Sequence, residues 1–254
     1  MKKTLYLITG ATGYLGSNIS RLLIARNKTV RALVLKDDPA ISQIPSEAEI
    51  VIGDIVNPYS VEAFFDVPDD PPCGIELVVI HCAGMTTFSP ELSEELYAIN
   101  VIGTQNIIHA CIRHNVKKLV YISSTDAIPE LPHGELIHEV DSFHPGLIVG
   151  GYGQTKARAT QLVLDAVKEY DLDASIVYPS GISGPNDHDN GYFTNFFINY
   201  VNGKVPAGIC GSLNTVDVRD LALGVISCSV KGRKGEGYIM SNNRFNARIV
   251  PPHQ

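Results

Sequence analysis

The stretch TLYLITGATGYLGSNI, residues 4–19, places three glycines, Gly10, Gly13 and Gly16, directly after an apolar run, and residues with helical spacing follow over 14–26. A turn from a strand into a helix aims several backbone N–H groups at one point, where the helix dipole adds partial positive charge, so a phosphate binds well. Glycine permits the tight turn and the close approach of a diphosphate. The stretch therefore predicts a dinucleotide-binding turn. Its GxxGxxG spacing differs from the commonest GxGxxG, and a plain strand-to-helix turn is the structural alternative.

Strand-like and helical stretches alternate over the first 180 residues. Apolar runs predict strands at 5–9, 30–35, 50–52, 77–80, 119–123 and 175–178. Helical spacing predicts helices at 14–26, 91–114 and 152–170. Alternation of this kind indicates parallel strands joined by crossover helices, and continuously apolar strands indicate a sheet covered on both faces. The predicted fold is a Rossmann-type, doubly wound α/β sheet, with residues 1–180 as the NAD(P)-binding domain.

The pattern changes near residue 181, where Gly, Pro and Asn become frequent. Short elements are predicted there: helices over 189–202 and 216–230, a strand over 237–241, and a loose tail from 246 to 254. We therefore predict a small substrate-binding lobe over 181–254, interleaved with the last strands of the sheet. Its wall is expected to mix aromatic and polar side chains, namely Asn186, His188, Tyr192, Phe193, Asn195 and Phe196. An amphipathic helix packed on the sheet would explain the aromatic residues equally well.

Composition narrows the class of protein. The net charge is −7 and no Lys/Arg run stands out, which argues against a nucleic-acid partner. The five cysteines are scattered without CxxC pairs, which is typical of reduced thiols in a cytoplasmic protein and does not indicate a metal site. No run approaches the roughly 18 apolar residues of a membrane span, and the start MKKTLYLIT is too short for a signal peptide.

The end of the second predicted strand is expected to select the cofactor. An acidic residue there would accept hydrogen bonds from the adenosine ribose of NAD, whereas a cation suits the 2′-phosphate of NADP. Lys36 stands at or beside this position and favours NADP, while Asp37, the next residue, leaves NAD open. A solvated charged turn is the structural alternative.

Two further strand ends carry residues suited to a flat cofactor. Asp54 follows the third strand, where a carboxylate can accept from the adenine amino group. Ala83 and Gly84 end the fourth strand, and small residues there let a cofactor pass against the backbone. His81 precedes them and is assigned no chemistry.

The stretch Tyr152-Gly153-Gln154-Thr155-Lys156 predicts proton-transfer chemistry. Tyr152 and Lys156 are four residues apart and share one face of a helix. A phenol titrates near 10, and a neighbouring ammonium favours phenolate, which brings proton transfer closer to neutral pH. The cluster Ser123-Ser124-Thr125, at the end of the fifth strand, would supply a hydroxyl that orients a substrate carbonyl.

These stretches resemble the extended short-chain dehydrogenase/reductases, also called the NAD(P)-dependent epimerase/dehydratase superfamily. The matching motifs, in the family's order, are TGATGYLG (9–16), GDI (53–55), HCAG (81–84), NVIGTQN (100–106), YISST (121–125), YGQTK (152–156), YPSGISGP (178–185) and VDVRDLA (216–222). The segment 202–220 is similar to the dihydroflavonol-4-reductase-like branch.

The resemblance implies a catalytic set on this chain. Tyr152 would act as general acid/base, Lys156 as its electrostatic partner and ribose ligand, and Thr125 as the carbonyl-orienting hydroxyl, with Ser124 as the substitute for that role. The implied cofactor-binding residues are Gly10, Thr12, Gly13, Tyr14, Leu15, Gly16, Lys36, Asp54, Ile55, Ala83, Gly84, Asn100, Lys156, Pro179, Gly181 and Ile182. For Asn100, a buried asparagine that only bonds backbone is an equal alternative.

The resemblance further implies hydride transfer between NADP (or NAD) and the carbonyl of a small molecule. The alternatives are a nucleotide-sugar epimerase or dehydratase with tightly held NAD, and a non-catalytic NADP-binding sensor. A homodimer through helices 91–114 and 152–170 is also implied. The family usually extends beyond the length of this chain, so a truncated lobe is expected. Departures from the family pattern are Thr160 for an acidic residue, Tyr178 for Arg, and Leu35-Lys36 for Arg.

Overall fold

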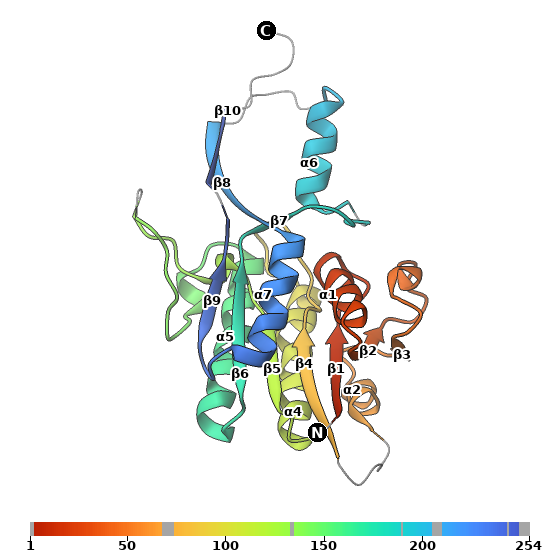
Figure 1. The fold of residues 1–254 in the computed structure, drawn as a ribbon. Helices are drawn as coiled ribbons and strands as arrows, with labels where there is room; N and C mark the ends of the chain where they lie inside the picture. Colours follow the sequence, from red (N-terminus) through yellow and green to blue (C-terminus); the bar gives the residue numbers. More distant parts are fainter. Residues whose placement is uncertain are drawn as a thin grey trace.

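A parallel sheet of seven strands forms the centre of the computed structural model, which describes residues 3–67, 74–132, 135–188, 190–204, 210–242 and 244–248 (Figure 1). The strand order is β3-β2-β1-β4-β5-β6-β9. The strands are β1 Lys3–Thr9, β2 Thr29–Val34, β3 Glu49–Ile52, β4 Ile75–His81, β5 Lys118–Ile122, β6 Ala174–Pro179 and β9 Gly237–Met240. All neighbouring pairs are parallel. The first six follow the order 3-2-1-4-5-6 of dinucleotide-binding folds, which confirms the predicted doubly wound sheet.

Helices cover both faces of this sheet. The helices are α1 Tyr14–Ala25 and α7 Val218–Lys231 on one face, and α2 Pro58–Phe65, α4 Thr104–Arg113 and α5 Gly151–Tyr170 on the other. Residues of β1 divide between the two layers, because Leu5 and Leu7 pack with α2, α4 and α5, whereas Tyr6 and Ile8 pack with α1 and α7. The continuous apolar character of the strands is thus explained by burial on both sides.

The predicted helix 91–114 is divided in three. It begins as α3 Glu94–Tyr97, continues as a π-helical segment over Ala98–Gly103, and ends as α4. Ser93 caps its start by accepting a hydrogen bond from the Leu96 N–H at 3.1 Å. A Cβ at position 103 would lie 2.5 Å from Ile55 Cδ1, so glycine allows this segment to pack against the loop after β3.

Helix α2 lay outside the predicted elements. Its start carries two local signals, since Asn57 caps it by accepting from the Tyr59 N–H, and Pro58 occupies the first helical position. The helix has only eight residues, too few for a clear apolar period.

The C-terminal lobe stands beyond the carboxyl ends of the parallel strands (Figure 1). Its elements are β7 Gly181–Ser183, α6 Tyr192–Val201, β8 Cys210–Asp217 and β10 Arg244–Arg248. The chain leaves the main sheet after β6, forms β7, α6 and β8, and returns through α7 and β9, so the lobe is interleaved with the last strands of the sheet.

Two predicted boundaries in this lobe were wrong. Val216 and Asp217 end β8 and precede α7, because residue 217 is the cap of that helix. Residues 246–248 are not a loose tail but part of β10, which pairs antiparallel with β8 over Arg244↔Asn214 to Arg248↔Cys210. Such pairing with a strand some 30 residues earlier leaves little local signal. Residues 249–254 lie outside the described part of the chain.

Three of the cysteines, Cys82, Cys111 and Cys228, carry free thiols. Within the described residues, we find no helix with the length and apolar character that crossing a bilayer demands.

Candidate active site

The glycine turn brings three backbone segments into close contact. Gly10 has a φ of +65°, and a Cβ there would lie 2.7 Å from the Ala83 nitrogen at the end of β4. A Cβ on Gly16, in the first turn of α1, would lie 2.1 Å from the Gly10 carbonyl oxygen. Gly13 donates its N–H to that same carbonyl at 3.1 Å. Only glycine fits Gly10 and Gly16, and the turn is therefore built for close backbone packing.

The N-terminus of α1 is open to an anion. Gly13 caps the helix without a side-chain hydrogen bond, and the first turn holds no acidic residue. The helix has 12 residues, so its first N–H groups and its dipole favour a negative group at this end. The Tyr14 hydroxyl, in the same turn, is buried without a hydrogen-bond partner in the described part of the chain. These features fit a dinucleotide diphosphate.

Tyr14 also faces the lobe. Burial raises the pKa of its phenol to about 12, and the nearby carboxylates of Asp187 and Asp217 act in the same direction. The hydroxyl therefore stays protonated and remains a hydrogen-bond donor at neutral pH. Asn186 reaches the same helix, since its side-chain amide donates to Asn18 Oδ1 at 3.2 Å.

Asp38, which the sequence analysis did not single out, hydrogen-bonds the glycine turn. Thr12 donates its hydroxyl to Asp38 Oδ2 at 2.8 Å, and the other carboxylate oxygen accepts from the Ala40 N–H at 2.8 Å. The Asp38-Pro39 pair is a turn signal that could have located this residue. Lys36 is exposed. Asp54 is also exposed, and its carboxylate accepts from the Val56 N–H.

A buried hydrogen-bonded chain joins the strand ends behind the turn. Thr104 donates to the Asn100 carbonyl, so its oxygen is an acceptor for the His81 Nε2–H at 3.0 Å. His81 Nδ1 then accepts from the Thr9 hydroxyl at 2.7 Å, and the Thr9 oxygen accepts from the Ala83 N–H. Burial, aided by the Lys156 charge, lowers the pKa of His81 to about 3 and keeps it neutral. His81 therefore ties β1 and β4 to α4.

Asn100 holds the loop after β4. Its side-chain amide donates to the Met85 carbonyl and to the Thr155 hydroxyl, and its oxygen accepts from the Met85 N–H. The side chain thus uses its hydrogen-bonding groups within the protein. Gly84 lies between this amide and Lys156, since a Cβ there would be 3.3 Å from Asn100 Oδ1 and 3.2 Å from Lys156 Nζ.

Tyr152 and Lys156 lie together on α5, as their spacing predicts. Lys156 is 5% exposed and donates from Nζ to the Ile122 carbonyl at 2.9 Å. The same Nζ is 5.4 Å from the centre of the Tyr121 ring and 6.0 Å from that of Tyr152, within the range of cation–π attraction. Burial lowers the pKa of Lys156 to about 8.

The environment of Tyr152 keeps its phenol protonated. Burial raises the pKa of Tyr152 well above its usual value of 10, and the Asp126 charge adds to the effect, while a hydrogen bond with Ser124 opposes it. At neutral pH the side chain is therefore a proton donor.

The three hydroxyl residues after β5 take different places. Ser123 is buried and bonds Thr160 on α5 at 2.7 Å, which accounts for the threonine at this departure from the family pattern. Ser124 lies close enough to Tyr152 to affect its pKa, and the Ser124 hydroxyl oxygen accepts from the Asp126 N–H at 3.1 Å. Thr125 donates to the Pro179 carbonyl at a long 3.3 Å. The structure thus places Ser124 beside the phenol and Thr125 beside the end of β6.

The lobe approaches the site at Gly181. The Phe193 ring of α6 would lie 2.7 Å from a Cβ at this position, so the first turn of α6 packs directly on β7. Ile182, the next residue, packs against the α1 and α7 layer. Arg219 forms an ion pair with Asp217 at 2.6 Å. His188 stands between Asp187 and Asp189 in the sequence, a spacing for which a polar loop is a better explanation than a metal cluster, and Asp189 lies outside the described residues.

Comparison with known proteins identifies the family to which this chain belongs. The family model described as NAD dependent epimerase/dehydratase matches residues 6–240. The chain belongs to this family. It is 29% identical over 238 residues to sterol demethylase protein B of Methylococcus capsulatus, covering 92% of this chain and 69% of that protein. It is 28% identical over 240 residues to a farnesyl-dihydroquinoline-oxide ketoreductase of Stigmatella aurantiaca, covering 92% and 67%.

A solved structure has the same fold as this chain. The crystal structure of gox2253 superposes with a TM-score of 0.84 at 30% identity, over 95% of this chain and 71% of that one. A dihydroflavonol 4-reductase-like protein of Synechocystis is 26% identical over 252 residues, which confirms the predicted resemblance. The relatives of this chain include proteins named as reductases and dehydrogenases. As a member of the epimerase/dehydratase family, the protein is therefore an NAD(P)-dependent oxidoreductase.

Replacing Lys156 with methionine should stabilise the fold while abolishing turnover. The folded pKa of about 8 lies below the ordinary 10.5, so burying the ammonium costs stability below pH 8. We expect Lys156→Met to gain about 1–3 kcal/mol at pH 7, less than the full pKa difference because the Ile122 carbonyl loses its donor. Thermal unfolding measures this.

The pH dependence of the folding stability, compared between two lysine variants, is the control for this prediction. Between pH 8 and 10.5 the unfolded chain binds more protons at Lys156 than the folded chain, so wild-type stability should rise with pH there. Lys168→Met, on the exposed face of the same helix, should retain that rise and Lys156→Met should lose it. A Lys156→Met protein less stable than wild type, with an unchanged pH profile, would contradict this account.

Proposed function

We propose that this protein reduces the carbonyl group of an apolar small molecule, or oxidises the corresponding alcohol, with NADP(H). The observation that carries the proposal is the convergence of Tyr152, Lys156 and Gly84 at the carboxyl ends of β4 and β5, beside the glycine turn. Gly10 and Gly16 allow the turn that would hold the diphosphate, and Ala83 and Gly84 would face the nicotinamide half. The bound nicotinamide supplies or accepts the hydride.

Each side chain of the site has a role in proton handling. Tyr152 is protonated at neutral pH and gives its proton to the carbonyl oxygen as that oxygen gains charge. Lys156 is largely charged below about pH 8 and stabilises the phenolate that results. The Thr125 hydroxyl, held only by a long bond to Pro179, would turn to donate to the carbonyl and orient it.

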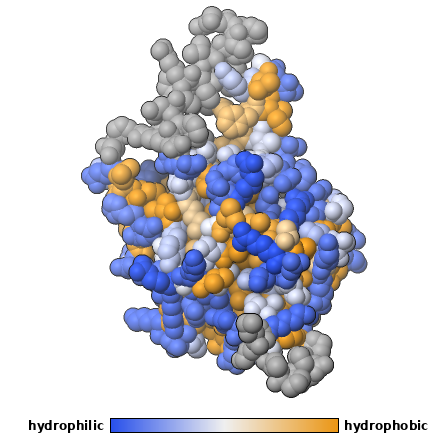
Figure 2. Space-filling model, in the orientation of Figure 1, coloured by the Kyte–Doolittle hydropathy of each residue, from blue (hydrophilic) through white to orange (hydrophobic). Residues whose placement is uncertain are grey.

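The apolar substrate class is supported by α6. This helix, YFTNFFINYV, contains no charged residue. Its Phe193 ring packs against Gly181, beside the site. Phe197 and Ile198 are 50% and 43% exposed, and Figure 2 shows hydrophobic side chains at the upper end of the molecule where α6 stands. Relatives are named for a sterol and for a farnesyl-bearing quinoline oxide. A ring-bearing or isoprenoid substrate would therefore suit this wall.

The epimerase/dehydratase alternative has less support. A nucleotide sugar carries a diphosphate, which proteins usually bind with Arg or Lys. Residues 181–204 include Lys204 but no other Lys and no Arg. The retained Tyr152 and Lys156 likewise disfavour a non-catalytic sensor.

A substrate panel with Tyr152→Phe tests the function. Wild type should oxidise NADPH with an apolar ketone such as a 3-ketosteroid and leave UDP-glucose unchanged. Tyr152→Phe should lower kcat/KM by about 10²–10⁴-fold without weakening NADPH binding, because the proton donor is lost. Tyr170→Phe, at the exposed end of the same helix, is the matched control and should behave as wild type. Retained turnover in Tyr152→Phe would refute the assignment.

The preference for NADP(H) is proposed on the charge of Lys36. Asp38 is bonded to Thr12 and to the Ala40 N–H, and Lys36, which is exposed, is the cation of this turn that could bind a 2′-phosphate. Lys36→Ala should weaken NADPH binding by about 5- to 10-fold and NADH binding by less than twofold. Calorimetric titration measures both. Lys28→Ala, at the other end of β2, is the control, and equal losses for the two cofactors would overturn the preference.

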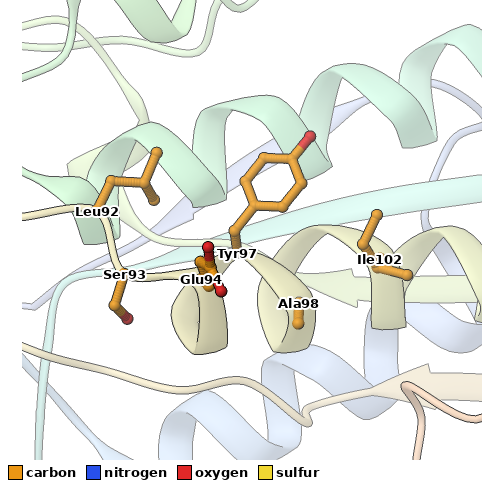
Figure 3. A pocket seen from close by; sticks show the side chains of 6 residues that line it. All are labelled: Leu92, Ser93, Glu94, Tyr97, Ala98 and Ile102. Atoms are coloured by element: carbon orange, nitrogen blue, oxygen red, sulfur yellow. The ribbon is translucent and has the colours of Figure 1, made fainter.

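A homodimer is proposed through helices 91–114 and 152–170. The outer face of this region holds a shallow apolar groove lined by Leu92, Ser93, Glu94, Tyr97, Ala98 and Ile102. Figure 3 shows Leu92, Tyr97 and Ile102 along the helical stretch beside α5. Leu92 is 47% exposed and Ile102 36% exposed, so apolar surface is available for a second copy.

Charge placed in this groove should dissociate the dimer. We expect Ile102→Glu to be monomeric at concentrations where wild type sediments as a dimer, because burying the carboxylate in an apolar interface is unfavourable. Leu223→Glu, at an equally exposed apolar position on α7 across the sheet, should stay dimeric. Wild type that sediments as a monomer would rule the interface out.

A further inference from the structure

A closed ring of hydrogen bonds runs along the Lys156 side chain. At the backbone end, the Lys156 carbonyl accepts from the Thr160 hydroxyl at 2.7 Å. At the other end, the Lys156 Nζ donates to the Ile122 carbonyl at 2.9 Å. The hydroxyl oxygens of Ser123 and Thr160 lie 2.7 Å apart and join the two ends. Because Thr160 gives its single proton to the Lys156 carbonyl, Ser123 is the donor in this last bond.

One peptide group carries the acceptor for the ammonium and also belongs to the ring. The Ile122 carbonyl and the Ser123 N–H are parts of the same planar unit. Its N–H donates to the Val177 carbonyl of β6 at 2.8 Å, and its oxygen accepts from Lys156. The bond from the Ser123 side chain to Thr160 ties the same unit to α5. This bond therefore limits rotation of the peptide group and fixes the direction of the carbonyl that holds Nζ.

The ring is removed from water. Thr160 is 0% exposed, Ser123 3% and Lys156 5%. Breaking the bond between the two hydroxyl groups would leave a buried donor without its acceptor, which costs free energy. The ring is therefore expected to stay closed in the folded protein, and the Lys156 ammonium has little freedom to move.

The ring places Nζ at the point where two strands end. A Cβ on Gly84, after β4, would lie 3.2 Å from Nζ, and the centre of the Tyr152 ring is 6.0 Å away. An ammonium has three N–H donors, and the bond to Ile122 uses one of them. A shift of this anchor would move the charge relative to the phenol whose proton transfer it assists.

The titratable groups around Nζ are neutral near pH 7. Burial raises the pKa of Tyr152 on α5 and of Tyr121 on β5 well above their usual value, and raises that of Cys82 to about 12. Burial, with the Lys156 charge, lowers the pKa of His81 to about 3. Among the described residues, Lys156 forms no ion pair, and its bonds are to neutral oxygens. Its position depends on directional hydrogen bonds.

We propose that Ser123 and Thr160 are positioning residues for Lys156, because their hydrogen bond fixes the Ile122 carbonyl and so holds the ammonium at Gly84, beside Tyr152. Neither residue touches substrate or cofactor in this role. Both act through the direction of one backbone carbonyl. The effect on turnover rests on the reductase function proposed above, whereas the effect on Lys156 itself does not.

Turnover of Thr160→Val with NADPH and a 3-ketosteroid tests the positioning role. Valine keeps the shape of threonine without its hydroxyl, so kcat should fall about 10-fold with the KM for the ketone within twofold, because the ammonium is misplaced. Thr160→Ser keeps the hydroxyl and should turn over within about twofold of wild type. Ser229→Ala is the control, since it removes a buried hydroxyl bonded to its own helix at 2.7 Å on the opposite face of the sheet.

Ser123→Ala removes the same bond from its other side. It should lose a similar factor, and the double variant should lose little more than either single one, since a single contact is broken. It also carries the test if Thr160→Val does not fold. Turnover equal to that of Ser229→Ala in both variants would overturn the proposal. So would a loss in Thr160→Val that Thr160→Ser shares.

A titration of Lys156 separates the positioning role from the reductase function. In protein labelled with ¹³C at lysine Cε, the Lys156 signal is the one that Lys156→Met lacks. Its midpoint should lie at lower pH in Thr160→Val than in wild type, because a firmly held acceptor favours the charged ammonium. Ser229→Ala should leave it unchanged.

Two outcomes of this titration are decisive. An unchanged midpoint in Thr160→Val would refute the positioning role even where wild type shows full turnover. A lower midpoint in a protein that turns over no ketone would support the positioning role and refute the reductase function.

Discussion

The contact of three backbones at the first turn is the constraint on which the rest of the structure depends. Gly16 packs its Cα against the Gly10 carbonyl, and Gly10 packs against Ala83 at the end of β4. These contacts place the open N-terminus of α1, the end of β1 and the end of β4 at one point in space. A methyl group on either glycine would separate them, because its contacts would be with backbone that cannot rotate away. The proposed diphosphate site lies at this junction, and the proposed nicotinamide site begins at its Ala83 side.

Hydrogen bonds offset the cost of burying several of the polar side chains behind the turn. His81, Thr9 and Thr104 form a continuous donor–acceptor chain, so a buried imidazole is kept neutral in one tautomer. Burial of the Lys156 ammonium is only partly offset, by one carbonyl and two aromatic rings. Burial lowers the pKa of Lys156 towards neutral pH, and the same burial of a charged group lowers the stability of the fold.

Much of the fold and the core of the site could be predicted from sequence because their signals are local. Apolar runs, helical periods and the glycine turn are each read within some 15 residues, and together they specify a doubly wound sheet. Tyr152 and Lys156 share a helix face whatever surrounds them. The π-helical segment, strand β10 and the Asp38–Thr12 bond could not be predicted, because each depends on a partner distant in sequence: Ile55 for the first, β8 for the second and the glycine turn for the third.

The sequence by itself determined the class of sheet, the place of the glycine turn and the pairing of a phenol with an ammonium, since periodicity and glycine sterics act between near neighbours. Only the tertiary structure decided which hydroxyl meets the phenol. Ser124 and Thr125 are adjacent and chemically alike, yet the turn packed on Gly153 directs one to Tyr152 and the other to Pro179. Side-chain direction in a turn is set by what the turn packs against, and that partner lies on a helix nearly 30 residues further along the chain.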